Sequence, residues 1–189
     1  MNRLKIYSMS IHLITGCMFS GKTSALINIA KMQKLLGKNV VIINYAGDTR
    51  YSSNSIIKTH DNISFDCIPC NKDMLLTILN TEQIKKAAVI CINEGQFFSQ
   101  LVYFSTKACE QLKDVYVCGL DGDYLKRPFG EILNLIPHCE SVCKLHALCM
   151  SCKNGNPASF TKKLTNSDKL IEIGATETYM PVCRLCYNN

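Results

Sequence analysis

Short apolar runs alternate along this chain with segments of helical periodicity. The apolar runs cover residues 11–15, 40–44, 88–93 and 115–120 and are rich in β-branched side chains. They do not alternate with polar residues, which is typical of strands buried on both faces of a sheet. Because helical segments separate these runs, we expect a parallel α/β sheet with right-handed crossover connections.

The clearest helical segment follows the first apolar run. Ala25, Ile29, Met32 and Leu36 fall at positions i, i+4, i+7 and i+11, which is the spacing of one helix face. Gly37 comes directly afterwards and predicts a left-handed stop.

Two further helices are expected between the later strands. One is indicated after the third apolar run by apolar residues at helical spacing, which are Leu101, Phe104, Ala108 and Leu112. A shorter helix is indicated upstream, with Asn71 as its candidate cap, by Met74, Leu75, Ile78 and Leu79.

The composition and the hydrophobic pattern of the chain change from about Cys139 onward, where cysteines become frequent and apolar runs shorten. We therefore predict two domains. Residues 1–138 form an α/β domain, and residues 139–189 form a small second domain. A segment of that size needs a staple such as a metal ion, because it cannot bury enough apolar surface alone.

Composition limits the classes of function. The chain has 189 residues, is 47% hydrophobic and carries a net charge of +6, which suits a polyanionic ligand but is too weak to indicate nucleic acid by itself. No apolar run reaches the roughly 18 residues that would cross a bilayer, and no cleavable leader is recognisable. We expect a soluble intracellular protein whose twelve cysteines are reduced thiols and metal ligands.

A phosphate-binding motif lies between the first strand and the first helix. Its glycines let successive backbone N–H groups point at phosphate oxygens, its lysine brings a positive charge to the β- and γ-phosphates, and its threonine can ligate Mg²⁺. The helix that follows directs its positive end at the same anion. The motif reads Gly16, Cys17, Met18, Phe19, Ser20, Gly21, Lys22 and Thr23.

The third strand ends in Asn93 and Glu94, at the carboxyl edge of the predicted sheet, where ligands of α/β folds bind. A carboxylate at this edge can accept a proton from an attacking hydroxyl, and a residue beside it can help to hold Mg²⁺. Glu94 is equally compatible with a solvated glutamate at a strand end. Phe97 and Phe98 are either core residues or candidates for stacking on a flat substrate.

Three Cys-x-x-Cys pairs occur in the chain. Two of them, Cys149/Cys152 and Cys183/Cys186, lie in the small domain and can supply four thiolates to a structural zinc ion. Disulfides and unrelated core thiols are the alternatives. The pair Cys67/Cys70 is isolated from any second pair and is more typical of incidental thiols than of a metal site.

Over about residues 10–187 the chain resembles the cellular and poxviral type of thymidine kinase. The phosphate loop alone is generic, but the ordered combination of short blocks is specific. The blocks are Gly16 to Thr23, Asp48-Thr-Arg-Tyr-Ser52, Thr59-His-Asp61, Glu94-Gly-Gln-Phe-Phe98, Leu120-Asp-Gly122, Arg127-Pro-Phe-Gly130, Glu140-Ser-Val142, Phe160-Thr-Lys-Lys163 and Cys183-Arg-Leu-Cys-Tyr187.

The resemblance implies an activity and a set of roles. It implies transfer of the ATP γ-phosphate to the 5′-hydroxyl of thymidine or deoxyuridine with Mg²⁺. Glu94 would be the general base, Lys22 and Arg50 would stabilise phosphate charge, and Thr23, Asp48 and Asn93 would lie beside the metal. The residues that match positions around the thymine are Met18, Phe97, Leu120, Tyr124, Thr161 and Tyr179.

The resemblance also implies an architecture and partners. The small domain would be a zinc-held base, with Cys149, Cys152, Cys183 and Cys186 as ligands, for a lasso loop that covers the nucleoside. Closure of such a lid would exclude water, so that the phosphoryl group is transferred to an alcohol. A cytoplasmic homotetramer with feedback inhibition by TTP is implied, without stable nucleic-acid or membrane partners.

Two residues depart from the family pattern. The family has proline where this chain has Cys17, and aspartate where this chain has Asn93. The loop's N–H groups remain available beside Cys17, whereas Asn93 removes a negative charge next to Mg²⁺. Asn93 leaves open a catalytically weakened nucleotide-binding homologue as an alternative to an active kinase. The positive net charge leaves open a second alternative, which is a P-loop zinc-ribbon ATPase that acts on nucleic acid.

Overall fold

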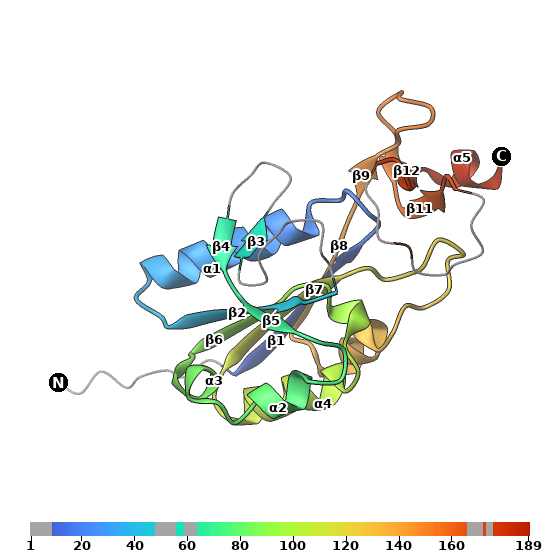
Figure 1. Cartoon of the computed structure of the whole chain (residues 1–189). Helices are drawn as coiled ribbons and strands as arrows, with labels where there is room; N and C mark the ends of the chain where they lie inside the picture. Colours follow the sequence, from blue (N-terminus) through green and yellow to red (C-terminus); the bar gives the residue numbers. More distant parts are fainter. Residues whose placement is uncertain (1–8, 48–55, 59–63, 166–171, 173–175) are drawn as a thin grey trace.

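The computed structural model describes residues 9–47, 56–58, 64–165, 172 and 176–189 of the chain. Its centre is a six-stranded sheet with the order β5-β2-β6-β7-β1-β8 (Figure 1). All neighbouring pairs in this sheet are parallel, so the predicted α/β class is confirmed. The strands are β1 (Ser10–Gly16), β2 (Val40–Tyr45), β5 (Ile68–Cys70), β6 (Val89–Ile92), β7 (Asp114–Gly119) and β8 (Ser141–Leu145).

Helices cover both faces of the sheet, which is why its strands show no alternation of apolar and polar residues. On one face lies α1 (Lys22–Leu35), and on the other lie α2 (Leu75–Ile78), α3 (Glu82–Lys86), α4 (Leu101–Glu110) and the 3-10 segment η3 (Ile132–His138) (Figure 1). Successive strand residues serve opposite faces. Ile42 belongs to the core under α1, for example, and Ile43 to the core under α4.

The first helix is where the sequence predicts it, but its buried face is offset from the predicted one. Leu26, Ile27 and Ala30 are buried, while Met32 and Leu36 are 64% and 72% exposed. The phosphate loop fixes the rotation of this helix, because it holds Lys22 inward and the residues one and two turns later follow on the same side. Gly37 has the predicted left-handed conformation, with φ +76°.

The predictions of the other two helices agree with the structure to different degrees. In α4, Leu101, Phe104 and Ala108 are fully buried as predicted, whereas Leu112 lies beyond the helix and is exposed. Asn71 does not cap α2, which begins after Met74 without a side-chain cap. The Asn71 backbone carbonyl accepts a hydrogen bond from the Met74 N–H instead, which forms a turn before the helix.

Several short strands were not predicted because they lack long apolar runs. A hairpin pairs β3 (Ile56–Lys58) with β4 (Ser64–Asp66), and β8 extends the main sheet beside β1. The small sheets near the C-terminal end pair β9 (Ala147–Leu148) with β10 (Pro157–Ala158), and β11 (Phe160–Lys163) with β12 (Tyr179–Val182). The last helix is α5 (Arg184–Asn188).

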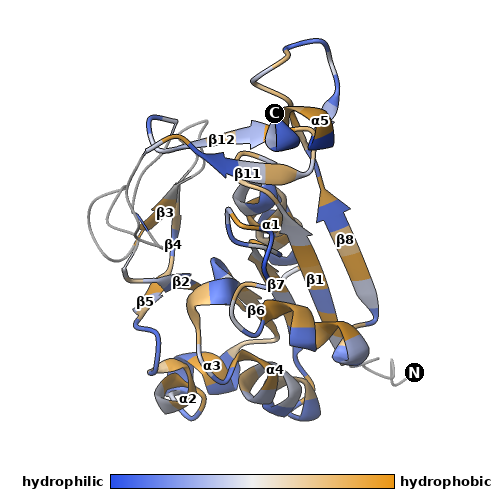
Figure 2. Cartoon of the chain, turned by 90° about the vertical axis from the view of Figure 1, so that its right-hand side faces the viewer, coloured by the Kyte–Doolittle hydropathy of each residue, from blue (hydrophilic) through white to orange (hydrophobic). Residues whose placement is uncertain are grey.

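The C-terminal elements β9 to β12 and α5 gather beyond the carboxyl end of β1 (Figures 1 and 2). We call this group of elements the annex. The boundary between residues 138 and 139 remains a prediction. No helix in the described part of the chain is long and apolar enough to cross a membrane.

The core beneath α4 makes a stability prediction. Phe104 is fully buried there, so Phe104→Ala leaves a large cavity and should lower the free energy of unfolding by about 3–5 kcal/mol. Tyr103 on the same helix is 53% exposed, and Tyr103→Ala should cost less than about 1 kcal/mol. Urea unfolding measures both, and equal losses would contradict the burial of Phe104.

Candidate functional site

The phosphate loop occupies the turn between β1 and α1 in a conformation that its glycines permit. Gly16 has φ +147°, and a Cβ there would meet the Leu145 carbonyl oxygen of β8 and approach Ser20 Oγ to 2.7 Å. Gly21 caps the helix in the left-handed region, with φ +82°. The backbone therefore curls tightly between the sheet and the first turn of α1, as the motif requires.

Lys22 lies inside this curl. Its ammonium donates to the Cys17 carbonyl at 2.6 Å and lies 3.5 Å from Ser20 Oγ, and the side chain is only 8% exposed. Ser20 Oγ also donates to the Cys17 carbonyl, at 2.9 Å. The loop thus holds a nearly buried positive charge at the positive end of a helix, which is an arrangement suited to a phosphate group.

Three neighbouring strands present polar atoms beside the first turn of α1. Thr23 Oγ1 donates to Asn93 Oδ1 at 3.1 Å, and Asn93 Nδ2 donates to Asn44 Oδ1 at 2.8 Å. Cys118 Sγ donates to the same Asn93 oxygen at 3.0 Å, and burial raises the pKa of this thiol, so that it keeps its proton. The sequence placed Asn93 beside Thr23 but missed Asn44 and Cys118.

The signal for the two missed residues lies in the strand register. Ile43 of β2 pairs with Ile92 of β6, and Ile92 pairs with Val117 of β7. Asn44 and Cys118 each stand one residue further along β2 and β7, and Asn93 follows β6 directly. Polar or thiol residues at the same level near the carboxyl ends of adjacent parallel strands can be expected to meet.

Glu94 follows β6 in the left-handed conformation, with φ +56°, and is held by Gln96. Gln96 Nε2 donates to Glu94 Oε2 at 2.6 Å, and Gln96 Oε1 accepts from the Leu120 backbone N–H at 3.0 Å. Gly119 and Gly130 approach Gln96 so closely that a Cβ on either would clash with it. Gln96 therefore ties the carboxylate to the backbone at Leu120.

Gln96 is a site residue whose role the sequence alone does not indicate. It was visible in the sequence only as the third residue of the block that begins at Glu94. Its side chain is 2% exposed, and both ends of its amide are hydrogen-bonded. A buried amide of this kind acts through the groups that it orients.

The two phenylalanines after Gln96 have different surroundings. Phe98 is buried in the core under α4. Phe97 is half-buried, with its ring stacked on Tyr45 at a centroid distance of 4.6 Å and in edge contact with Phe129 at 5.3 Å. Tyr45, Phe97 and Phe129 therefore form an aromatic wall of three rings, whose central ring belongs to the third residue after Glu94.

The other residues predicted to surround the nucleoside lie in or next to the annex, and one of them bonds to the phosphate loop. The Met18 backbone N–H donates to Thr161 Oγ1 at 3.0 Å, and the Tyr124 carbonyl accepts from the Tyr187 hydroxyl at 2.6 Å. The Tyr179 hydroxyl accepts from the Glu172 backbone N–H at 3.2 Å. The predicted residues Asp48 and Arg50 lie outside the described part of the chain.

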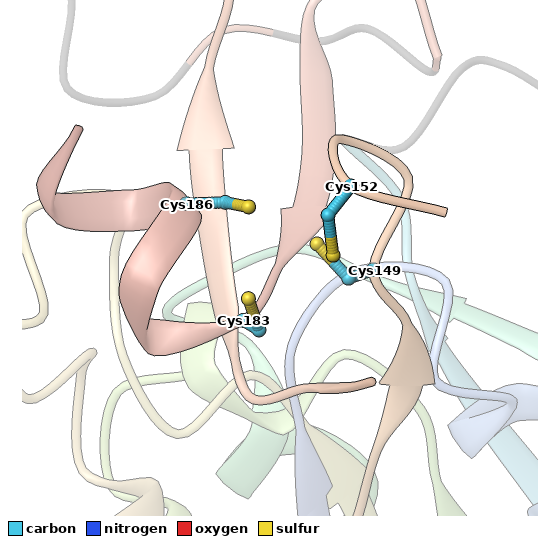
Figure 3. Close-up of side chains that lie close together, drawn as sticks. All are labelled: Cys149, Cys152, Cys183 and Cys186. Carbon is cyan, nitrogen blue, oxygen red and sulfur yellow. The ribbon is translucent and has the colours of Figure 1, made fainter. Parts of the chain in front are cut away.

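The annex brings the four predicted cysteine ligands together. The sulfurs of Cys149, Cys152, Cys183 and Cys186 all lie within 4.8 Å of one another and point toward a common centre (Figure 3). Four thiolates around one zinc ion, with Zn–S bonds of about 2.3 Å, stand about 3.8 Å apart, so a slight contraction of this cluster would accommodate the ion.

The four thiols of the cluster are close neighbours that form no disulfide with one another. All twelve cysteines fall within the described residues, and all are free. Hydrogen bonds from backbone N–H groups, that of Cys152 foremost, lower the pKa of Cys149 to about 6. For Cys186, a hydrogen bond with Ser151 lowers the pKa, but hydrogen bonds with Cys183 and the other cluster thiols raise it to about 11. Burial raises the pKa of Cys67 and of Cys70 to about 11, and neither belongs to the cluster.

Cys17 joins the phosphate loop to the cysteine cluster. It is 2% exposed and packs in one apolar cluster with Cys149, Ala158, Val182 and Cys183. Its sulfur donates to the Ala158 carbonyl at 3.3 Å. The departure from proline at this position therefore places a small apolar side chain in the core of the annex.

Comparison with known proteins gives one consistent result. The family model for thymidine kinase matches residues 9–187. The thymidine kinase of Yaba monkey tumor virus is 42% identical to this chain, covering 94% of it and 93% of the relative. Thymidine kinase 1 of Dictyostelium discoideum is 39% identical, covering 95% and 78%, and the cytosolic thymidine kinase of Homo sapiens is 41% identical, covering 94% and 72%.

The packing of Cys17 makes a reactivity prediction. Because burial raises the pKa of its thiol, Cys17 should react with iodoacetamide at about pH 8 at least tenfold or so more slowly than the exposed Cys143 of β8. Mild denaturant that opens the annex should remove the difference. Peptide mass spectrometry of alkylation measures both rates, and rapid labelling of Cys17 in the native protein would contradict its packing.

Proposed function

Because this chain belongs to the thymidine kinase family, we propose that it transfers the γ-phosphate of ATP to the 5′-hydroxyl of thymidine, with deoxyuridine as a second acceptor. The observation that carries the proposal is the joint presence of a phosphate loop around Lys22 and a fixed carboxylate, Glu94, at the edge of the same sheet. The family model spans both features and the cysteine cluster as well.

Glu94 is the general base of this reaction. It accepts the proton of the 5′-hydroxyl as that oxygen forms a bond to the γ-phosphorus, and the bond from phosphorus to the bridging oxygen of ADP breaks. The hydrogen bond from Gln96 supports this role, since it holds one carboxylate oxygen and leaves the other for the hydroxyl. Proton and phosphoryl group thus move in a site whose base is already oriented.

The phosphates bind to residues 16–23, with Lys22 and Arg50 stabilising charge on the transferred group. Thr23, Asn93 and Asp48 hold the nucleotide-bound Mg²⁺. The Thr23 oxygen is a hard ligand of the kind that this ion takes, and the Asn93 amide oxygen lies beside it and accepts a hydrogen bond from the Thr23 hydroxyl. When bound, Mg²⁺ neutralises charge on the β- and γ-phosphates. Neutral Asn93 lowers the affinity for the ion but leaves the positioning groups in place, so we expect activity to be retained.

The thymine is bound by the residues that join the loop to the annex and to the aromatic wall. Phe97 stacks against the base. The hydrogen bond between Met18 and Thr161, and the link from Gln96 to Leu120, support a pocket between the carboxyl edge of the sheet and β11. The proposed lining residues are Met18, Phe97, Leu120, Tyr124, Thr161 and Tyr179.

The cysteine cluster holds a structural zinc ion that gives the annex its rigidity. Residues 139–189 contribute one small apolar cluster to the core of the described chain, which is little for a segment of this length. A positive side chain beside the cluster supports a bound metal with four thiolates, since it offsets part of the negative charge. Lys162 donates to the Cys186 carbonyl at 3.1 Å.

Assembly and regulation follow the family expectation. A homotetramer is supported by the apolar side chains that α1 leaves exposed near its end, namely Met32, Leu35 and Leu36. A cytoplasmic location accords with the cytosolic human relative. TTP acts as a feedback inhibitor in this proposal by binding where the nucleoside and phosphates bind.

The function is tested by phosphorylation assays with ATP and thymidine beside the other deoxynucleosides. We expect thymidine and deoxyuridine to be the preferred acceptors. Glu94→Gln should lower kcat by about 10²–10⁴-fold with little change in ATP binding, because it removes the proton acceptor alone. Glu110→Gln on the surface of α4 is the matched control. A wild-type protein that hydrolyses ATP without transfer to thymidine would refute the proposal.

Metal analysis tests the zinc site. The purified protein should contain about one zinc ion per chain, and Cys183→Ser should lose the ion and unfold at lower temperature. Cys143→Ser, which removes an exposed thiol of β8, should change neither property. Zinc content that persists in Cys183→Ser would show that the ion binds elsewhere.

A further inference from the structure

The side-chain amide of Asn93 must be oriented correctly to accept a hydrogen bond, whereas a carboxylate at this position would not need a particular orientation. The amide has one oxygen and one NH₂ group, so only one of its two orientations offers an acceptor to Thr23. In the structure the oxygen faces Thr23 Oγ1 at 3.1 Å, and the NH₂ group faces Asn44 Oδ1 at 2.8 Å. The orientation of Asn93 therefore depends on what stands opposite its NH₂ group.

Asn44 is fixed at that place by the sheet. Parallel pairing of β2 with β6 sets Ile43 opposite Ile92, and the Asn93 backbone N–H donates to the Ile43 carbonyl at 2.9 Å. The two asparagines thus each follow directly after the paired residues Ile43 and Ile92, so their side chains begin from neighbouring backbone positions. The side chain of Asn93 is 4% exposed, so water can hardly replace Asn44 as the acceptor.

We propose that Asn44 is a positioning residue of the metal–nucleotide site, which fixes the Asn93 amide with its oxygen toward Thr23. This inference rests on the proposed use of Thr23 and Asn93 in binding Mg²⁺ with the nucleotide. The Thr23 hydroxyl then donates its hydrogen bond to Asn93, and the lone pairs of the Thr23 oxygen remain available to the metal. The thiol of Cys118 donates to the same amide oxygen and supports the same orientation.

The opposite orientation would disable Thr23 as a ligand. The NH₂ group of Asn93 would then donate to the Thr23 oxygen and occupy a lone pair that the metal needs. A chain with aspartate at this position would have two equivalent oxygens and would need no partner to choose between them. Asn44 is thus needed because position 93 carries an amide, whose orientation must be fixed, and not a carboxylate.

The test measures ADP affinity by titration calorimetry, with saturating Mg²⁺ and again in EDTA. Asn44→Ala should weaken binding of Mg²⁺ with ADP by about tenfold, because the amide loses its fixed partner, and should leave binding in EDTA unchanged. Asn44→Asp retains an acceptor for the Asn93 NH₂ group and should keep the metal-dependent affinity. Asn39→Ala removes an asparagine side chain that bonds to the Lys86 carbonyl at the opposite end of β2 and serves as the control.

A double-mutant cycle separates orientation from general damage. In an Asn93→Asp background, Asn44→Ala should change the metal-dependent affinity by less than about twofold, since a carboxylate has no wrong orientation. Asn44→Leu repeats the test at similar side-chain volume if the alanine variant unfolds. Equal losses in both backgrounds, an equal loss in EDTA, or no metal dependence in the wild type would overturn the inference.

The cycle is independent of the phosphoryl acceptor. If the wild type fails to phosphorylate thymidine but the coupling between Asn44 and Asn93 is observed, the proposed function fails and the positioning role stands. If thymidine is phosphorylated without that coupling, the positioning role fails alone.

Discussion

The contact between the phosphate loop and the annex is the constraint on which the site depends. Residues 16–23 are closed on one side by β8, whose Leu145 carbonyl allows no side chain at Gly16. On the other side Cys17 and Met18 bond to Ala158 and Thr161. The loop is thus part of the annex core as well as a turn of the sheet, and the geometry of the annex is transmitted to it through short, direct contacts.

Burial and hydrogen bonding give each polar group of the site a single arrangement. Glu94 has a left-handed backbone conformation, which costs conformational energy in any residue other than glycine. Its carboxylate is held by a hydrogen bond from the Gln96 side chain. Gln96 is in turn confined by Gly119 and Gly130. Such preorganisation is useful for phosphoryl transfer, in which positioning and charge neutralisation carry most of the chemistry.

Local patterns in the sequence were sufficient where one principle decides the structure. The long apolar runs predict β1, β2, β6 and β7, and the glycine motif predicts the phosphate loop and the start of α1. The two Cys-x-x-Cys pairs predict a cluster of four thiols, and the fold brings those four sulfurs together. In each case the signal lies in consecutive residues, so the rest of the chain was not needed to interpret it.

The features that escaped prediction depend on packing between distant segments. The face that α1 buries is set by Lys22 in the loop and not by the apolar spacing of Ala25 and Met32. The strand β8 is exposed along most of its length and has no apolar run. Asn44 and Gln96 are ordinary polar residues in the sequence, and only the register of the strands and the glycines around them give them a role.

The position of Cys17 has a consequence for the order in which the protein is assembled during synthesis. Cys17 emerges from the ribosome early, but the side chains that cover it, Val182 and Cys183, are made more than a hundred residues later. The phosphate loop can therefore complete its packing only after the C-terminal cysteine pair has been synthesised.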